Sequence, residues 1–247
     1  MDITKLIAIF FIGVLGSFIG AMAGSGGLIS IPFLILAGLP PQVAIATHKF
    51  GSAGLKLGAL TRFWRTPNIN WQYFIPFSII GFCAAIVGTQ ILIAIDKALL
   101  QDIVAILLLA VLPVLFLNKD TGVMHRTTSV LRKMLGYIFY FLAQVFGAFF
   151  GGGAATIVFY ILMTFFGLTI IEASATTMLP SLIMTLTSLL MFAAYGILDY
   201  PVGIVLFCGM LVGGWLGAHT AIKVGSLWVK LLFVVLVVVS AIKLLME

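Results

Sequence analysis

The stretch "IGAMAGSGGLISIP", residues 19–32, decides the fold because it places glycines inside a long apolar run. Gly24, Gly26 and Gly27 stand where a membrane-spanning helix would be expected to continue. Glycine weakens helices and accepts backbone conformations with positive φ, so the stretch predicts a helix break. A break in lipid exposes backbone groups that no water satisfies, and it survives only where protein or a water-filled cavity surrounds it. We therefore expect these glycines to lie inside a bundle of helices.

The composition indicates which solvent surrounds that bundle. The 247 residues are 63% hydrophobic and 8% charged, with a mean hydropathy of +1.28. Soluble domains contain about 25% charged residues. Several apolar stretches approach or exceed the roughly 20 residues that cross a bilayer as a helix, and they lack the alternation of transmembrane β-strands. The sequence predicts an all-α polytopic membrane protein, with the lipid bilayer as a partner.

The net charge of +6 does not indicate a nucleic-acid-binding protein. Most basic residues lie in short connections that flank the apolar segments. In a membrane protein this placement reports on topology, because basic loops stay on the cytoplasmic side.

The glycine-rich stretch recurs in the second half of the chain. The sequence "GAMAGSGG", which begins at Gly20, reappears as "GAFFGGGA" beginning at Gly147, an offset of 127 residues (147 − 20). Further on, "GLPPQVAIATHK" from Gly38 matches "GLTIIEASATTM" from Gly167 at an offset of 129 residues (167 − 38). The chain is therefore predicted to contain two copies of one unit, with two residues inserted in the second.

Each copy is expected to contain one broken element followed by three helices. The broken elements cover residues 5–37 and 135–166; the helices cover 42–63, 71–94 and 98–117 in the first copy and 171–194, 201–222 and 227–246 in the second. The division is repeat 1 (1–117), a cytoplasmic linker (118–134) and repeat 2 (135–247), which together form one membrane domain. Asn70 and Asp199, paired by the offset of 129, are expected to cap the helices that follow them.

The broken element decides the topology. As one helix of about 33 residues it would be about 50 Å long, too long for a single upright crossing of about 30 Å. If it crosses once, the copies are parallel (4+4, eight full spans). If it is a re-entrant hairpin, each copy crosses three times and the second copy is inverted. Inversion places the basic loops on one side, as the positive-inside rule requires; their residues are Arg62, Arg65, Lys119, Arg126, Arg132, Lys133, Lys223 and Lys230. We therefore expect inverted repeats, with the parallel arrangement as the alternative.

The two glycine-rich breaks are candidate binding sites. Interrupted helices at matching places of inverted repeats are the best sequence indication of a secondary transporter's site. The half-helix after each break begins with free N–H groups and a partial positive charge. The predicted anion cradles are Gly24, Ser25, Gly26 and Gly27 in the first copy and Gly151, Gly152 and Gly153 in the second. The alternative is that these small residues only allow close packing of helices.

The helix after the first break carries several polar residues on one face. At 100° per residue, His48, Lys49, Ser52 and Lys56 fall within an arc of about 100°. A lysine near the bilayer centre costs about 2.5–3.5 kcal/mol, so Lys56 is expected to face the interior or a wet cavity. In the second copy, neutral residues take the aligned positions. The candidate substrate-binding residues on the two helices are Thr47, His48, Lys49, Ser52, Lys56, Thr176, Thr177 and Ser181.

Structural alternatives exist for these residues. Lys49, near the start of its helix, could extend to the membrane interface, and His48 could be a packing histidine. The hydroxyls of the second copy could bond to their own helix. Glu172 could couple proton movement, or it could stabilise the start of its helix as an N-terminal carboxylate.

The stretch "AGSGGLISIPFLILAGLPPQVAIATHKF" (23–50), with "TRFWRTPNINW" (61–71) and "FGAFFGGGAATIVFYI" (146–161), resembles the sulfite exporter TauE/SafE family of membrane permeases. The resemblance covers essentially the whole chain. It implies an inner-membrane exporter of small sulfur-containing or carboxylic anions, such as sulfite, sulfonates or sulfoacetate. The family's glycine-rich run and its Ala-Thr-x-Lys stretch map onto residues 24–27 and 46–49. The second copy departs from that pattern, with Thr177 and Met178 where the first has His48 and Lys49.

No catalytic residue set and no nucleotide-binding loop is present, so we expect no enzyme, no cofactor and no metal. Without a Walker motif, transport would rely on a coupling ion, a proton or sodium, or on facilitated diffusion. We expect a secondary transporter that exports a small anion by alternating access and binds it between the two breaks. The alternatives are an anion channel or facilitator and a membrane scaffold without transport activity. A homodimer remains open, because Gly213, Gly214 and Gly217 could support helix contact inside or between protomers.

Overall fold

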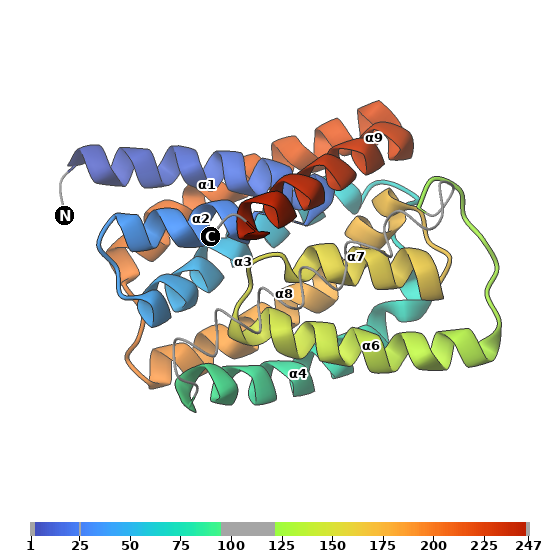
Figure 1. Cartoon of the computed structure of the whole chain (residues 1–247), viewed down its shortest axis with the longest axis horizontal. Helices are drawn as coiled ribbons and strands as arrows, with labels where there is room; N and C mark the ends of the chain where they lie inside the picture. Colours follow the sequence, from blue (N-terminus) through green and yellow to red (C-terminus); the bar gives the residue numbers. More distant parts are fainter. Residues whose placement is uncertain (1–2, 25, 95–121, 246–247) are drawn as a thin grey trace.

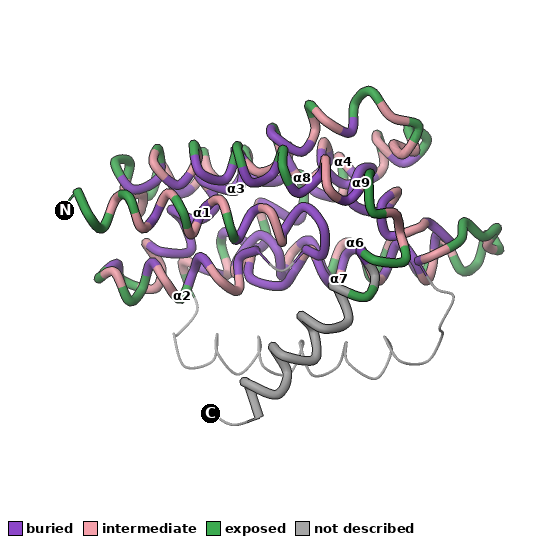
Figure 2. The backbone as a smooth tube through the Cα atoms, turned by 90° about the horizontal axis from the view of Figure 1, so that it is seen from above, coloured by how far each residue is buried: buried purple, intermediate pink, exposed green. Residues whose placement is uncertain are grey.

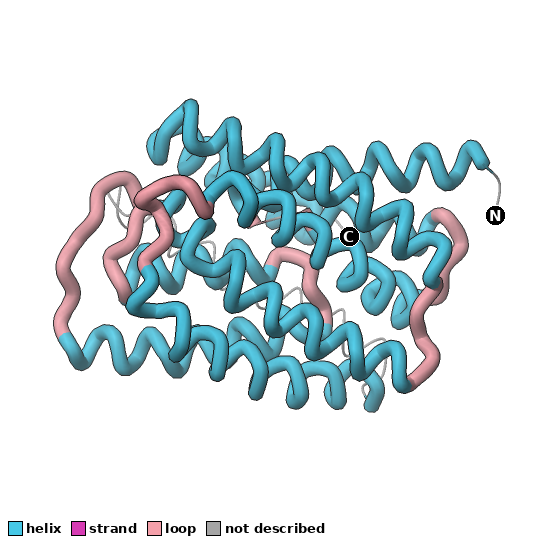
Figure 3. The backbone as a smooth tube through the Cα atoms, turned by 180° about the vertical axis from the view of Figure 1, so that it is seen from behind, coloured by secondary structure: helices cyan, strands magenta, loops and turns pink. Residues whose placement is uncertain are grey.

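The computed structural model describes residues 3–24, 26–94 and 122–245, and this part of the chain is a bundle of helices without strands (Figure 3). The helices are α1 (Ile3–Ala23), α2 (Gly27–Leu36), α3 (Pro41–Phe63), η1 (Trp71–Tyr73, a 3₁₀ turn), α4 (Phe74–Ala94), α6 (Val130–Phe149), α7 (Ala154–Phe165), α8 (Ile170–Ala194) and α9 (Tyr200–Leu245). The predicted all-helical class is confirmed. The helix expected at 98–117 lies outside the described residues.

Four segments in the described ranges are long and apolar enough to cross a bilayer: Ile3–Ala23, Trp71–Ala94, Ile170–Ala194 and Tyr200–Val229. α2 and α7, with 10 and 12 residues, are apolar but too short to cross about 30 Å of hydrocarbon. Each of these short helices follows one of the glycine-rich breaks. The protein is therefore a multi-pass membrane protein in which two short helices accompany the long ones.

The breaks occur at equivalent glycines of the two copies. Gly24 and Gly151 both have positive φ, 78° and 82°. At each break the chain reverses, so that α2 lies beside α1 and α7 lies beside α6 (Figure 1). The first hairpin opens toward the end of the bundle where the chain begins, here called the N-terminal end. The second opens toward the end that holds residues 122–129, here called the linker end. These directions are those that an inverted repeat requires, while the orientation in a membrane stays a prediction.

The packing between helices has the same two-fold character. α9 lies along α1 and α3, and α4 lies along the equivalent helices α6 and α8. Thr47 Oγ1 accepts a hydrogen bond from the backbone N–H of Asp199 (3.1 Å). Thr176 Oγ1 accepts one from the N–H of Asn70 (3.0 Å). The two accepting threonines are related by the offset of 129, and so are the two residues that donate the N–H groups. Each copy therefore makes the same contact with the other.

The capping predictions for this pair have different outcomes. Asp199 Oδ1 accepts a hydrogen bond from Val202 N at 3.1 Å, so the predicted cap of α9 is confirmed. The Asn70 side chain makes no cap bond to the turn that follows it, so that prediction is wrong. The first turn after Asn70 is the 3₁₀ turn η1, where the hydrogen bonds connect closer residues than in an α-helix.

The first helix of the second copy begins before residue 135, where the sequence analysis placed the start of that copy. α6 starts at Val130, inside the predicted linker 118–134, because Ser129 Oγ accepts a hydrogen bond from Arg132 N (3.4 Å) and caps the helix. The remaining described linker residues, 122–129, lie against the α7–α8 connection. There Arg126 N donates to the carbonyl of Gly167 at 2.8 Å.

The C-terminal helix α9 is interrupted between the two helices that the sequence analysis predicted there. Gly225 has φ 81° and ψ 167°, outside the helical region, within the 46 residues of α9. A straight helix of that length would extend about 69 Å, more than twice the hydrocarbon thickness. The break therefore separates two segments that correspond to the expected helices 201–222 and 227–246.

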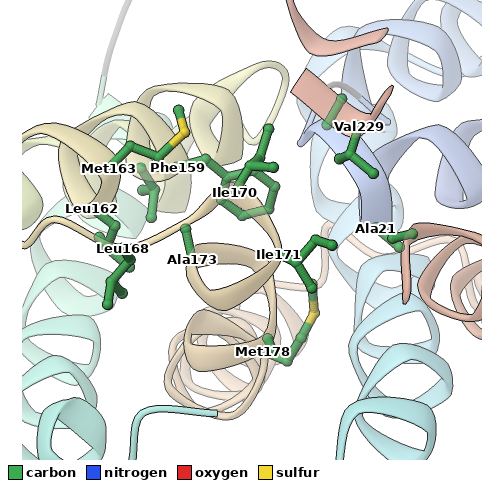
Figure 4. Packing of buried hydrophobic residues seen from close by; sticks show 14 of the residues in the cluster. Ala21, Phe159, Leu162, Met163, Leu168, Ile170, Ile171, Ala173, Met178 and Val229 are labelled. Atoms are coloured by element: carbon green, nitrogen blue, oxygen red, sulfur yellow. The ribbon is translucent and has the colours of Figure 1, made fainter. Parts of the chain in front are cut away.

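Buried residues concentrate where the two hairpins meet in the middle of the bundle (Figure 2). The largest buried cluster joins α7 and α8 to α1, α3, α4, α6 and α9, and Figure 4 shows part of it around Phe159, Ile171 and Met178. The glycines of α9 take part in packing inside the protomer. A Cβ atom at Gly213 or Gly217 would collide with backbone oxygens of α1, and one at Gly214 with that of Leu55 in α3.

Candidate functional site

The two glycine breaks contact each other directly. A Cβ atom at Gly24 would lie 2.5 Å from the backbone nitrogen of Thr156, at the start of α7. A Cβ atom at Gly27 would lie 2.9 Å from the carbonyl oxygen of Gly151. Both distances are too short for a side chain, so glycine is what allows the two breaks to meet.

A cavity of about 80 Å³ lies beside this crossing. A cavity that holds one water needs only about 10–15 Å³, so this one has room for several waters or a small ion. Its walls come from α1, α2, α3, α6, α7 and α8. Ten of the sequence-predicted residues line it: Gly24, Gly26, Gly27, His48, Lys49, Ser52, Lys56, Gly151, Thr177 and Ser181.

Lys49 lies in the interior of the bundle. Its side chain is 3% exposed, so it does not extend to the membrane surface. The ammonium group donates a hydrogen bond to the carbonyl of Gly147, in the last turn of α6. Carbonyls in the last turn of a helix have no partner within the helix, so Lys49 satisfies one of them. A Cβ atom at Gly151 would lie 3.3 Å from Nζ, which places the ammonium next to the second break.

His48 connects the first break to α3. Its Nδ1 lies 2.8 Å from the hydroxyl of Ser30 in α2, and which of the two donates depends on the tautomer of the ring. The opposite nitrogen, Nε2, would lie 3.1 Å from a Cβ atom at Gly27. The imidazole therefore lies between α2 and the crossing of the two breaks.

Ser52 and Lys56 continue the polar wall along α3. Ser52 Oγ donates to the carbonyl of Lys49 at 3.0 Å, and Lys56 Nζ donates to Ser52 Oγ at 3.3 Å. Three residues with basic side chains, His48, Lys49 and Lys56, thus line one cavity. No carboxylate lines it within residues 3–24, 26–94 and 122–245.

The wall from the second copy is neutral. Thr177 Oγ1 donates to the carbonyls of Ala173 (2.8 Å) and Ser174 (3.1 Å), so its hydroxyl hydrogen is directed into its own helix. Met178, the equivalent of Lys49, lines the cavity and is buried. Ser181 lines the same wall. The difference between the two copies that the sequence indicates is thus present in the cavity.

Several predicted residues lie elsewhere. The hydroxyls of Thr47 and Thr176 accept the hydrogen bonds between the copies described above, and neither residue lines the cavity. Gly152 and Gly153 also lie outside its lining, although Gly153, with φ 74°, precedes the first residue of α7. Ser25 lies outside the described residues.

Gln144 is a lining residue that the sequence analysis did not select. It is 2% exposed, and its amide nitrogen donates to the hydroxyl of Tyr140 at 2.7 Å. A signal was available: Gln144 is the one amide in the otherwise apolar run 134–150, and polar residues inside membrane segments usually face the bundle interior.

Glu172 stabilises the start of α8. Its carboxylate accepts a hydrogen bond from the N–H of Thr169 at 2.8 Å, while Thr169 Oγ1 accepts one from Glu172 N at 3.2 Å. This reciprocal pair is a capping box. The carboxylate also lies 3.0 Å from His125 Nδ1 in the linker, at the surface of the bundle. Glu172 does not line the cavity.

The cavity combines basic side chains with neutral hydrogen-bonding groups. Buried basic groups are costly unless an opposite charge or hydrogen bonds compensate them. Cationic donors, hydroxyls and backbone groups at two helix breaks together suit a small ligand with several oxygen atoms. The described residues contain no cluster of three or more metal-ligating side chains.

Curated relatives support a transport role. A probable membrane transporter protein of Haemophilus influenzae is 29% identical over 96% of this chain and 93% of its own length. The probable membrane transporter protein YfcA of Escherichia coli is 26% identical over 95% of this chain and 86% of its own. A third, ORF9 of a Sinorhizobium species, carries the same description at 24% identity over 98% and 93% of the two chains. No solved structure matches the chain at a significant level.

The family comparison covers nearly the whole chain. The family described as "Sulfite exporter TauE/SafE" matches residues 9–244 of this chain. This range includes both glycine breaks and all the residues that line the cavity. The chain therefore belongs to the sulfite exporter TauE/SafE family of membrane transporters.

Proposed function

We propose that this transporter exports a small oxyanion, such as sulfite, a sulfonate, sulfoacetate or a related carboxylate, and binds it between the two glycine breaks. The observation that carries the proposal is the environment of Lys49, a buried lysine whose one hydrogen bond among the described residues goes to a neutral carbonyl. No ion pair of Lys49 with a carboxylate occurs in the described ranges. An anion in the cavity would supply the missing negative charge.

The size and lining of the cavity support a small ligand. A volume of about 80 Å³ leaves room for an anion with a few heavy atoms. Lys56 extends the donors along α3, and Gln144 adds an amide from α6. A sulfite or carboxylate group could thus accept several hydrogen bonds at once, each stronger than a neutral one where the donor is charged.

Alternating access is the mechanism that the arrangement of the two copies favours. Transporters with inverted repeats move one repeat or bundle against the other around a site near the midplane. Here α1 of the first copy packs on α9 of the second, and α6 of the second packs on α4 of the first. The cavity lies between elements of both copies, so relative movement of the copies would change which side has access to it.

The binding experiment uses Lys49→Met. Methionine occupies the equivalent position, Met178, on the opposite wall of the same cavity, so the substitution is expected to leave the protein folded. Loss of a hydrogen bond to a charged group is worth about 1.5–3 kcal/mol, which corresponds to at least about a tenfold weaker affinity. The control is Lys5→Met, which removes the same charge from an exposed position near the start of α1.

Binding is measured as the rise in thermal stability of the purified protein with sulfite, sulfoacetate, thiosulfate and acetate. We expect at least one anion to stabilise the parent and the Lys5→Met variant, and to lose its effect with Lys49→Met. If a stabilising anion binds folded Lys49→Met with unchanged affinity, the proposed site is wrong.

Transport in liposomes separates a carrier from a channel. A carrier is expected to show saturable flux and counterflow of the anion that stabilises the protein. Flux that does not saturate and shows no counterflow would instead support an anion channel. Dependence of the flux on an imposed proton or sodium gradient identifies the coupling ion.

A further inference from the structure

A group of basic side chains lies at the linker end of α3 and α9, away from the cavity. Arg62 is in the last turn of α3. His219 and Lys223 precede the interruption of α9 at Gly225. Arg62 and Lys223 are both close enough to His219 to act on it electrostatically. These three residues, here called the basic cluster, come from two helices that pack against each other.

The basic cluster has buried nitrogen atoms without a hydrogen-bond partner, and it has no carboxylate partner among the described residues. Arg62 Nε and His219 Nδ1 are buried atoms without a hydrogen-bond partner in the described part of the chain. The one ion pair there joins His125 and Glu172, so none of the three residues is neutralised within residues 3–24, 26–94 and 122–245. Buried polar atoms nearly always have a partner, so the cluster lacks an anionic or accepting group.

An apolar groove begins directly next to the basic cluster. It has a volume of about 340 Å³ and is lined by Leu57 and Thr61 of α3 and by Val212, Trp215 and Leu216 of α9. The Thr61 hydroxyl donates to the carbonyl of Gly58 at 2.7 Å, so it adds no free polar group to the groove. Trp215 stacks on His219 with ring centroids 5.2 Å apart and connects the groove to the cluster.

The groove leads from the cluster toward the middle of the bundle. α3 and α9 run in the same direction, because Gly51 faces Leu206 and Gly58 faces Leu211. Along both helices the groove residues precede the basic residues in the sequence, and both helices run toward the linker end (Figure 1). A molecule that occupies both the basic cluster and the groove therefore has a negatively charged end at the cluster and an apolar part deeper in the bilayer.

The level of the basic cluster matches a membrane interface. Trp64 and Trp71 lie at the same end of the bundle, half exposed, with ring centroids 5.1 Å apart. Tryptophan is enriched where hydrocarbon meets the headgroups. Basic pockets between membrane helices near that level bind the headgroups of anionic lipids.

We propose that an anionic phospholipid binds between α3 and α9 at the linker end, with its headgroup phosphate on Arg62, His219 and Lys223 and an acyl chain in the adjacent groove. The phosphate oxygens accept hydrogen bonds from the Arg62 guanidinium, the Lys223 ammonium and the histidine ring, and the acyl chain covers Leu57, Val212 and Leu216. This site is independent of the transported anion, because none of the residues of the basic cluster lines the central cavity.

The charge requirement is tested by native mass spectrometry of the full-length protein in detergent, with added dioleoyl phosphatidylglycerol or dioleoyl phosphatidylcholine. We expect phosphatidylglycerol to be retained at lower concentration than phosphatidylcholine. Arg62→Gln and Lys223→Gln should each weaken its retention about fivefold, the factor for about 1 kcal/mol per basic residue. Arg65→Gln is the control, because it removes one positive charge from an exposed residue at the same end.

The acyl-chain requirement is tested with the same lipid and with glycerol 3-phosphate, which carries the phosphate without a chain. Val212→Trp fills the groove and should reduce retention of phosphatidylglycerol, while Val87→Trp, a similarly exposed position on α4, should not. Glycerol 3-phosphate should not compete with the lipid at equal concentration.

Three results would overturn the proposal. One is equal retention of the two phospholipids by the parent protein. Another is an effect of Arg65→Gln as large as that of Arg62→Gln, which would indicate only general attraction to a basic surface. The third is a lipid-free dimer of the parent protein that Val212→Trp dissociates, which would show that a second copy of the chain covers the groove.

Discussion

Replacement of Gly24 by alanine tests whether the contact between the two breaks holds the bundle together. An L-residue in the left-handed region that Gly24 adopts costs about 1–2 kcal/mol. The new Cβ atom would also lie 2.5 Å from Thr156 N and 2.6 Å from Ala155 C, whereas ordinary contacts begin at 3.4 Å. The chains must therefore separate by about 0.9 Å (3.4 − 2.5), and the atoms that must move belong to the backbone. Overpacking of this kind costs about 1–3 kcal/mol in addition.

Alanine substitutions at two other glycines separate the cost of backbone strain from the cost of overlap between atoms. Gly38 and Gly196 also have positive φ, 106° and 67°, but a Cβ atom at either would have no neighbour within 4 Å. Gly38→Ala and Gly196→Ala are thus expected to show only the strain. An additional cost of about 2 kcal/mol corresponds to a further fall in Tm of about 4–8 °C, measured by thermal unfolding in detergent. If Gly24→Ala is as stable as the two control variants, the close contact between the breaks is refuted.

Three further predictions concern contacts outside the cavity. Thr47→Val and Thr176→Val each leave a backbone N–H of the other copy without its acceptor, so each should lower the free energy of unfolding by about 1–3 kcal/mol; an unchanged value for both would contradict the reciprocal contact. Ser129→Ala should lower it by about 1 kcal/mol through loss of the α6 cap, and no change in thermal unfolding would argue against helix initiation at Val130. Glu172→Gln keeps a carbonyl oxygen for the α8 cap and loses the negative charge at the start of α8, opposite His125, which is 49% exposed. Its cost should therefore stay below about 1 kcal/mol, and a larger loss of stability would mean that the charge has another partner.

The breaks and the polar face of α3 could be predicted from the sequence because both follow from local rules. Glycine in an apolar run indicates a break wherever it occurs, and a helix repeats its faces every 3.6 residues. Those rules place His48, Lys49, Ser52 and Lys56 on one wall without any knowledge of the neighbouring helices. The matching break at Gly151 required only the comparison of the two halves of the chain.

The partners of the hydroxyl groups could not be predicted in the same way. Thr47 and Thr176 lie next to cavity residues in the sequence, but each one contacts a helix start in the other copy. A rotation of 100° per residue is enough to separate neighbours onto different faces, and which face meets which helix depends on the packing of both copies. Gln144 illustrates the converse, since its polarity was visible in the sequence while its position in the cavity depends on how α6 packs.

The two copies are equivalent where they hold the fold, and they differ in charge where they line the cavity. Thr47 and Thr176 make matching contacts, so both copies need a threonine at this position for the same reason. Lys49 and Met178 also occupy equivalent positions, but only the lysine can donate a hydrogen bond and carry charge. A ligand shared by the two walls would therefore meet its charge partner on the first copy, whichever side the cavity opens to. In the proposed alternating-access mechanism, the second copy would change its contacts without uncovering a buried charge, since the described residues of its wall at this level are neutral.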